Sequence, residues 1–516
     1  MSAYQEKNKQ NKKQLSALTS WDALTSGYLK LLFFILPLCF HNGYFDITET
    51  KSLAFYSLSS VYILCFLGYV SVKLFRRKKG EVIGKAYCKP QALDIAFLCF
   101  LLFAFISTIF AMHPASAWLG RESRYQGFLT ILLYGILYYL ISKANIKQSN
   151  FILPAAIAFS LVSLLAILHG FHVDVFGFHQ NIGADNEKIF ISTIGNINFY
   201  SSYMVLLFPF LICGYCQSHE KLSRWIYTAV LILGSCGILL TASESFAVGY
   251  VVAMALVPLF LSNTQELKRF LQASMLNIVV MQIYKWLYLR YGTGQYEISR
   301  LLCILTHPLV AILSFLLSFG AYWLLTKQEN RQKLFKIIYL SLLLAATLLL
   351  LLGFLLCNTL WAEKDLGVLD MYFKITDSWG TYRGQIWKFC LQKYKELPLR
   401  QKLFGIGPEN LYLVTRDFPR FTNLHLDAAH NEYLQHLMTI GLFGLLSYVA
   451  ILGSTVFLFL KRLRKNPLAI GLMTGLIGFW IQAVVNIAQP FTTPLMYIFV
   501  ACIASLYHTE QTKSMK

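Results

Sequence analysis

Apolar runs close to 20 residues long recur along almost the whole chain, with short polar connections between them. Folded as an α-helix, a run of about that length spans the roughly 30 Å hydrocarbon core of a bilayer. Hydrophobic residues make up 56% of the chain and charged residues only 14%, against about 25% charged residues in a soluble domain. The sequence therefore predicts an all-α, polytopic integral membrane protein of the cell membrane, folded as a helical bundle.

We expect about 12–14 transmembrane helices. The predicted spans are 29–46, 52–74, 92–111, 125–142, 151–170, 198–216, 225–242, 245–262, 273–289, 301–325, 337–357, 436–460, 468–486 and 494–507. This divides the chain into a tail at 1–28, spans within 29–357, a long loop at 358–435, further spans within 436–507 and a tail at 508–516. The span at 273–289 contains Lys285, so a helix lying flat in the membrane interface is an alternative there.

The positive charges are distributed unevenly among the connections. Lys and Arg concentrate in both tails and in alternate connections such as 75–91 and 461–467, whereas the short connections between these carry few. Cytoplasmic loops of membrane proteins hold this excess. We therefore expect both termini in the cytoplasm and the 358–435 loop outside it. The net charge of +20 is then explained by the membrane topology, and a nucleic-acid partner is not expected.

The long loop carries charges of both signs, a helix-like aromatic segment, TYRGQIWKF, and a turn sequence, GIGPEN. We expect an ordered cap on the membrane domain that holds the active site. Where this loop meets the next span, His430 and Glu432 stand close together in the sequence. A histidine at such a boundary is neutral near pH 7 and takes a proton from a hydroxyl group.

Several plainer interpretations of this segment remain open. In one, His430 is only a polar residue at the membrane interface. In the others, Asp427 or Asn431 caps the following helix, and Glu432 stabilises that helix through its dipole. Glu432 orienting the His430 ring is another alternative. A zinc site of His425, His430 and His436 is not favoured, because their spacing does not follow the i, i+4 pattern of a helical pair.

Three arginines are expected on the outer side, against the general charge bias. They are Arg383 in the aromatic segment, and Arg121 and Arg124 in LGRESRYQGF. A guanidinium group binds phosphate oxygens in bidentate fashion and stays charged, so a diphosphate clamp is one explanation. The alternatives are snorkelling or stacking of Arg383, and a pair between Arg121 or Arg124 and Glu122 or an acid of the loop.

The segments LFGIGPEN at 403–410 and DAAHNEYLQHLMTIGLFGLL at 427–446 resemble the signature of the O-antigen ligase and O-antigen polymerase family. TYRGQIW at 381–387 is similar to an arginine-containing segment that precedes this signature. GYFDITETK at 43–51 and GNINFYSSYM at 195–204 are similar to segments of Gram-positive-type members. The resemblance extends over most of the chain.

This resemblance implies transfer of a glycan from an undecaprenyl-diphosphate carrier to a hydroxyl group of a glycan, a lipid or a protein. It also implies His430 as the general base and Arg383 as the diphosphate-binding residue, and we expect Glu432 to take part in catalysis beside His430. One segment departs from the family: TASES at 241–245 has Glu244 where an arginine is expected. Three explanations are open: Arg121 or Arg124 supplies the positive charge of the missing arginine, the protein holds the donor in a different way, or the activity is altered.

Physical chemistry agrees with that implied role, because diphosphate is already a good leaving group. The protein needs fixed cations for the developing charge and a base for the attacking hydroxyl group, so we expect no metal and no cofactor. A transporter or flippase of lipid-linked glycan is the alternative from another class, and it places charged residues along a path through the helices. An inactive family member is the third possibility.

Overall fold

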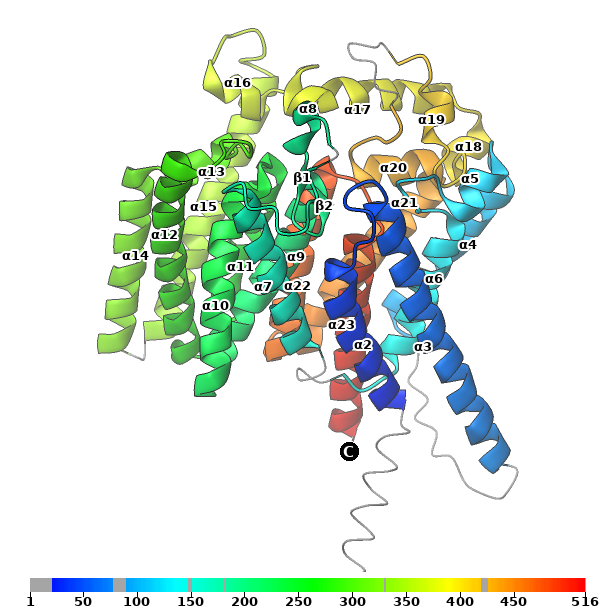
Figure 1. Ribbon diagram of the computed structural model, residues 1–516, viewed down its shortest axis with the longest axis horizontal. Coiled ribbons are helices and arrows are strands. Elements are labelled where there is room, and N and C mark those ends of the chain that lie inside the picture. The colour runs from blue at the N-terminus through cyan, green and yellow to red at the C-terminus, as the bar shows by residue number, and fades with distance from the viewer. Residues whose placement is uncertain are drawn as a thin grey trace, which may run out of the picture.

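The computed structural model describes residues 21–77, 90–146, 151–180, 182–328, 331–418 and 426–515. Within these ranges the chain is a bundle of long helices, with short helices gathered at one end (Figure 1). The strands described there are β1 (Phe190–Ile191) and β2 (Gly195–Asn196), which form one short antiparallel pair. The predicted all-α class is confirmed.

Ten helices in the described ranges are long and apolar enough to cross a membrane, which confirms the predicted multi-pass membrane protein. They are α2 (Trp21–Leu38), α3 (Ile47–Arg77), α4 (Ala92–Ile109), α7 (Ile152–His169), α9 (Ile197–Gln217), α10 (Lys221–Gly237), α14 (Pro308–Lys327), α15 (Gln332–Asn358), α21 (Gly441–Leu458) and α22 (Pro467–Gln482). The other long helices are α6 (Phe128–Ser142), α11 (Glu244–Phe260), α12 (Thr264–Tyr291) and α23 (Thr492–Met515). Short segments η2 (Ile238–Thr241), η4 (Phe459–Leu463) and η5 (Ala483–Val485) extend α10, α21 and α22.

The first described helix includes residues before the predicted span at 29–46 and ends earlier than that span. α2 contains Trp21, whose ring lies 5.0 Å from that of Phe66 in α3. It ends at Leu38, where the Lys51 ammonium group donates to the carbonyl oxygens of Leu36 and Pro37, at 3.0 Å each. Apolar content alone does not place this end, because a side chain of the next helix caps it.

Two other predicted spans differ in form. The segment around Lys285 is part of α12, which runs alongside α14 in the bundle (Figure 1). The Lys285 ammonium group donates to the Thr306 hydroxyl oxygen at 2.9 Å, so its charge has a polar partner. The predicted span at 436–460 is divided, because α20 (Glu432–Thr439) ends before Gly441, which has a φ of +83° and begins α21.

The centre of the bundle is formed by α9 and α22. A side chain at Gly475 of α22 would collide with the Leu206 carbonyl oxygen of α9, so the two backbones approach closely. The Gln482 amide donates to the Ser201 hydroxyl oxygen at 2.8 Å across the same interface. Small residues and interhelical hydrogen bonds of this kind stabilise helix pairs in membranes.

One end of the bundle, which we call the loop face, carries the described part of the predicted long loop (Figure 1). Its helices are α16 (Val368–Phe373), α17 (Trp379–Glu396), α18 (Leu399–Phe404), α19 (Leu411–Val414) and α20. The short helices α5 (Pro114–Leu119), α8 (Ala184–Glu187) and α13 (Arg300–Leu305) lie at this end too. The GIGPEN turn is tied to the end of α20, since the Gly407 amide donates to the Thr439 carbonyl oxygen at 3.0 Å.

The C-terminal end of α23 lies at the opposite end of the bundle from α17 (Figure 1). With the charge bias of the sequence, this arrangement predicts that a reporter inserted near residue 400 is active outside the cytoplasm. The same reporter fused after residue 516 should be active inside it. Activity of both fusions on one side of the membrane would contradict the expected orientation.

Candidate functional site

His430 is the residue just before the N-cap of α20. Asn431 is the cap, because its side-chain oxygen accepts a hydrogen bond from the Leu434 amide at 3.0 Å. The capping interpretation therefore applies to Asn431 and not to His430. His430 has a φ of +48°, in the left-handed region, and its side chain is half-buried. No described side chain hydrogen bonds to its ring, which leaves the imidazole available to a substrate.

Within the loop face, a small apolar cluster packs α17 against α20. Its buried members come from α17, α19, α20 and the residue before His430: Ile386, Cys390, Leu411, Ala429, Leu434 and Met438. Arg383 lies one helical turn before Ile386, and His430 directly follows Ala429. Packing of apolar neighbours thus brings together two candidate residues that lie far apart in the sequence.

Arg383 begins the regular part of α17. The three residues before it, Gly380, Thr381 and Tyr382, all have positive φ, so the helix is kinked there. The Arg383 Nη1 donates to the Gly380 carbonyl oxygen at 2.8 Å, and its Nε is buried without a hydrogen-bond partner. Among the described residues, no carboxylate forms an ion pair with this guanidinium group. Burial lowers its pKa.

Arg124 and Arg121 take different partners at the loop face. Arg124 forms a bidentate pair with Asp427, with Nη2–Oδ2 and Nη2–Oδ1 distances of 2.8 and 2.9 Å. This is the loop-acid pairing that the sequence left open. The Arg121 guanidinium carbon lies 4.1 Å from the centre of the Tyr412 ring. Both arginines therefore connect the segment before α6 to the long loop.

The electrostatic environment keeps His430 neutral. Burial, together with the charges of Arg383 and Arg124, lowers its pKa to about 4, while Asp427 acts in the opposite direction. At pH 7 the imidazole therefore has a free lone pair and can accept a proton. These effects also show that both arginines lie within electrostatic range of the ring.

Glu409 is a residue of this site that sequence reasoning missed. It lies in the GIGPEN turn with a φ of +59°. Burial raises its pKa to about 7, and the charges of Arg124 and Arg121 partly oppose this shift. The only sequence signal was an acid within a glycine turn, which describes many surface loops. Its contact with the arginines depends on the tertiary fold.

Glu432 lies apart from the His430 ring. Its side chain is 2% exposed and accepts a hydrogen bond from the Tyr448 hydroxyl at 2.9 Å. Its Oε1 lies 3.8 Å from His436 Nε2, and no hydrogen bond joins it to His430 within the described segments. Glu432, His436 and Glu409 line a cavity of about 40 Å³ together with Gln126 and Tyr497, which is enough for a small number of waters.

A zinc site formed by His425, His430 and His436 was not favoured by the sequence. His425 lies outside the described residues. His430 and His436 do not belong to a group of three metal-ligating side chains in the part of the chain that is described.

Glu244 has a structural partner that accounts for its position. Its two carboxylate oxygens accept hydrogen bonds from the Arg300 and Leu301 amides, at 2.8 and 3.0 Å. These are the first amides of α13, where a carboxylate favours the helix dipole. Glu244 therefore joins α11 to α13.

Comparison with known proteins finds one family similar to part of the chain. Residues 298–449 match the family model described as O-antigen ligase. The matched segment contains Arg383, Glu409 and His430, whereas Arg121 and Arg124 lie before it. No curated protein matches the chain. With its many membrane-spanning helices, the chain is a multi-pass membrane protein, and its residues 298–449 are similar to the O-antigen ligase family.

Proposed function

We propose that this protein transfers a glycan from an undecaprenyl-diphosphate carrier to a hydroxyl group at the outer face of the cytoplasmic membrane. The observation that carries the proposal is the neutral His430 close to Arg383, a half-buried arginine without a carboxylate partner among the described residues. A base and an unpaired cation are the two groups that such a transfer requires. The proposed reaction uses no metal.

In the proposed reaction, a ring nitrogen of His430 takes the proton of the acceptor hydroxyl group. The hydroxyl oxygen then bonds to the anomeric carbon of the donor sugar, and the bond from that carbon to the diphosphate oxygen breaks. The diphosphate leaves with the electron pair, so negative charge grows on its oxygens. Arg383 binds these oxygens, and Arg124 and Arg121 add positive charge nearby.

The acids of the site have supporting roles in this proposal. Asp427 fixes the Arg124 guanidinium group by two hydrogen bonds. Glu432 accepts from Tyr448 and so holds the first turn of α20, directly after His430. Both are positioning residues, because neither is placed to take the acceptor proton.

The pH dependence of transfer tests this arrangement. We expect kcat/KM of the purified protein to fall only as the pH approaches about 4, because the free protein must lose the neutral form of His430. Replacing Arg383 with glutamine removes a positive charge, so the acid limb should move up toward the ordinary histidine value. The assay measures the glycosylated acceptor and the released undecaprenyl diphosphate in detergent or liposomes.

The same assay separates the proposed enzyme from a flippase. A flippase in liposomes moves the intact lipid-linked glycan to the other leaflet and releases no diphosphate. Movement of intact donor without any glycosylated acceptor would contradict the proposed transfer.

The pH experiment has its own contradicting outcome. If the acid limb of kcat/KM lies at the same pH with and without Arg383, the proposed proximity of Arg383 and His430 is wrong.

A further inference from the structure

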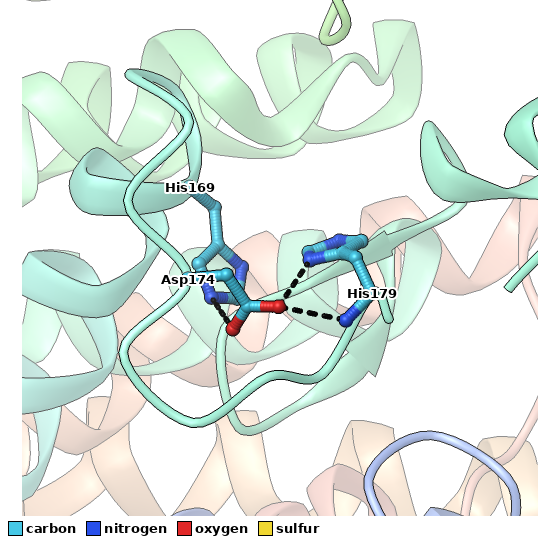
Figure 2. Close-up of side chains that lie close together, drawn as sticks. All are labelled: His169, Asp174 and His179. Atoms are coloured by element: carbon cyan, nitrogen blue, oxygen red, sulfur yellow. Dashed lines mark hydrogen bonds and ion pairs between the residues drawn. The ribbon is translucent and has the colours of Figure 1, made fainter. Parts of the chain in front are cut away.

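A second cluster of titratable side chains lies after α7, outside the segment that matches the family. Figure 2 shows its three members: His169 from the end of α7, and Asp174 and His179 from the connection that follows. His169 Nε2 lies 3.5 Å from Asp174 Oδ1, and His179 Nδ1 lies 3.3 Å from Asp174 Oδ2. His169 is 3% exposed. The proposed transfer uses none of these residues.

The hydrogen bonds of His179 define where its lone pair lies. Its Nε2 is 3.2 Å from the Phe190 carbonyl oxygen, which only accepts, so Nε2 carries the proton. The Tyr296 hydroxyl also donates to this carbonyl, at 2.8 Å. His179 Nδ1 then presents a lone pair to Asp174 Oδ2, which already accepts from the His179 amide at 2.7 Å. Two acceptors at this distance require a cation between them.

On the other side of the carboxylate, the Ser192 amide donates to His169 Nδ1, so His169 Nε2 carries the ring proton while that hydrogen bond stands. His169 Nε2 and Asp174 Oδ1 are both buried without a hydrogen-bond partner, and they face each other (Figure 2). His169 Nδ1 lies 3.2 Å from the Ser192 amide and 3.4 Å from the Tyr44 hydroxyl oxygen. That hydroxyl donates to the Ser192 carbonyl oxygen, so it can accept a proton from Nδ1. When Nδ1 carries the proton, Nε2 is free to bind a metal and the Ser192 amide contact is given up.

From this geometry we propose that His169 Nε2, His179 Nδ1 and the Asp174 carboxylate bind a divalent transition-metal cation of the Zn²⁺ class. Imidazole nitrogens and a carboxylate are the ligands of such ions, with bonds of about 2.0–2.2 Å. Ligand atoms of a tetrahedral site are then about 3.3 Å apart, close to two of the distances observed here. The three ligand atoms lie within 4.8 Å of one another, and the third distance shortens when the ion binds.

The partners of the two histidines are those of a metal site. A ligating histidine commonly donates its other ring proton to a carbonyl or hydroxyl oxygen, which fixes the ring. Phe190 provides such a carbonyl for His179, and Tyr44 provides a hydroxyl for His169. The bound ion therefore joins α7, its following connection, β1 and the connection between α2 and α3. Its role is to stabilise this corner of the loop face, and the transfer reaction remains metal-independent.

Metal binding by the full-length protein tests the proposal. The protein is purified without a polyhistidine tag, treated with a chelator, and titrated with Zn²⁺ by calorimetry and with Co²⁺ by visible absorption. We expect one bound ion, a higher unfolding temperature with Zn²⁺, and the visible bands of tetrahedral Co²⁺. His179→Gln and Asp174→Asn each remove a ligand, so the affinity should fall by at least the roughly 10–100-fold seen for the loss of a supporting partner.

His172→Gln is the matched control, because His172 is an exposed histidine of the same connection. It should bind Zn²⁺ as the unchanged protein does. The proposal is overturned if the unchanged protein binds no Zn²⁺, or if His179→Gln binds it equally well. In that case a proton on His179 Nδ1 is the cation between the two acceptors, and Asp174 forms an ordinary ion pair with an imidazolium.

Discussion

Replacing His430 with alanine is expected to lower the rate of glycan transfer by a factor on the order of 10²–10⁴, the usual contribution of a positioned general base. The imidazole is neutral at pH 7 and no described side chain hydrogen bonds to it, so its loss removes the proposed proton acceptor. Donor binding should be retained, because in the proposed mechanism the arginines bind the diphosphate. The measurement is the transfer rate of purified variants with saturating donor and acceptor.

His219→Ala provides the control for this experiment. His219 is an exposed histidine in the connection between α9 and α10, well outside the loop face. Its removal should leave both transfer and folding unchanged. Transfer at the full rate by a folded, donor-binding His430→Ala variant would exclude His430 as the base and leave it as a polar residue of the interface.

Replacing Arg383 should weaken the donor complex most strongly. A hydrogen bond to a charged group contributes roughly 1.5–3 kcal/mol, and about 1.4 kcal/mol is a tenfold change in affinity. Arg383→Lys keeps the charge but loses the planar fork, so we expect donor binding to weaken by roughly 10–100-fold. Arg383→Ala loses both, and the loss should be about tenfold greater or more. Binding is measured at pH 8, where His430 is neutral with or without Arg383.

Arg400→Lys is the matched control on the same loop. The Arg400 guanidinium carbon lies 5.0 Å from the centre of the Phe110 ring, and the side chain is exposed. Its replacement should leave donor affinity unchanged. Equal donor affinity in Arg383→Lys, Arg383→Ala and the unchanged protein would favour the snorkelling interpretation of Arg383.

The fold class could be predicted from the sequence because lipid surrounds the protein. A helix that crosses lipid must be long and apolar, and that pattern is visible without any tertiary information. The exact ends of helices were less predictable. α2 ends where the Lys51 side chain of the next helix caps it, a contact that apolar content does not reveal.

Those residues of the candidate site that lie in short sequence motifs could be singled out from the sequence. His430 and Arg383 were singled out from HNEYLQ and TYRGQIW, and the structure brings them close together through the cluster that packs α17 on α20. The partners of Arg124 and the environment of Glu409 were not predictable in the same way. The two residues of the Arg124–Asp427 pair are separated by most of the chain, and Glu409 acquires its raised pKa only when the turn is buried.

The left-handed backbone of His430 connects the chemistry of the site with the stability of the fold. A φ of +48° costs a residue with a side chain roughly 1–2 kcal/mol relative to right-handed geometry, whereas glycine adopts it readily. The fold therefore gives up stability to hold an imidazole at this point, next to a capped helix and the half-buried Arg383. Selection for thermal stability alone should favour glycine at position 430, and it would remove the proposed base in the same step.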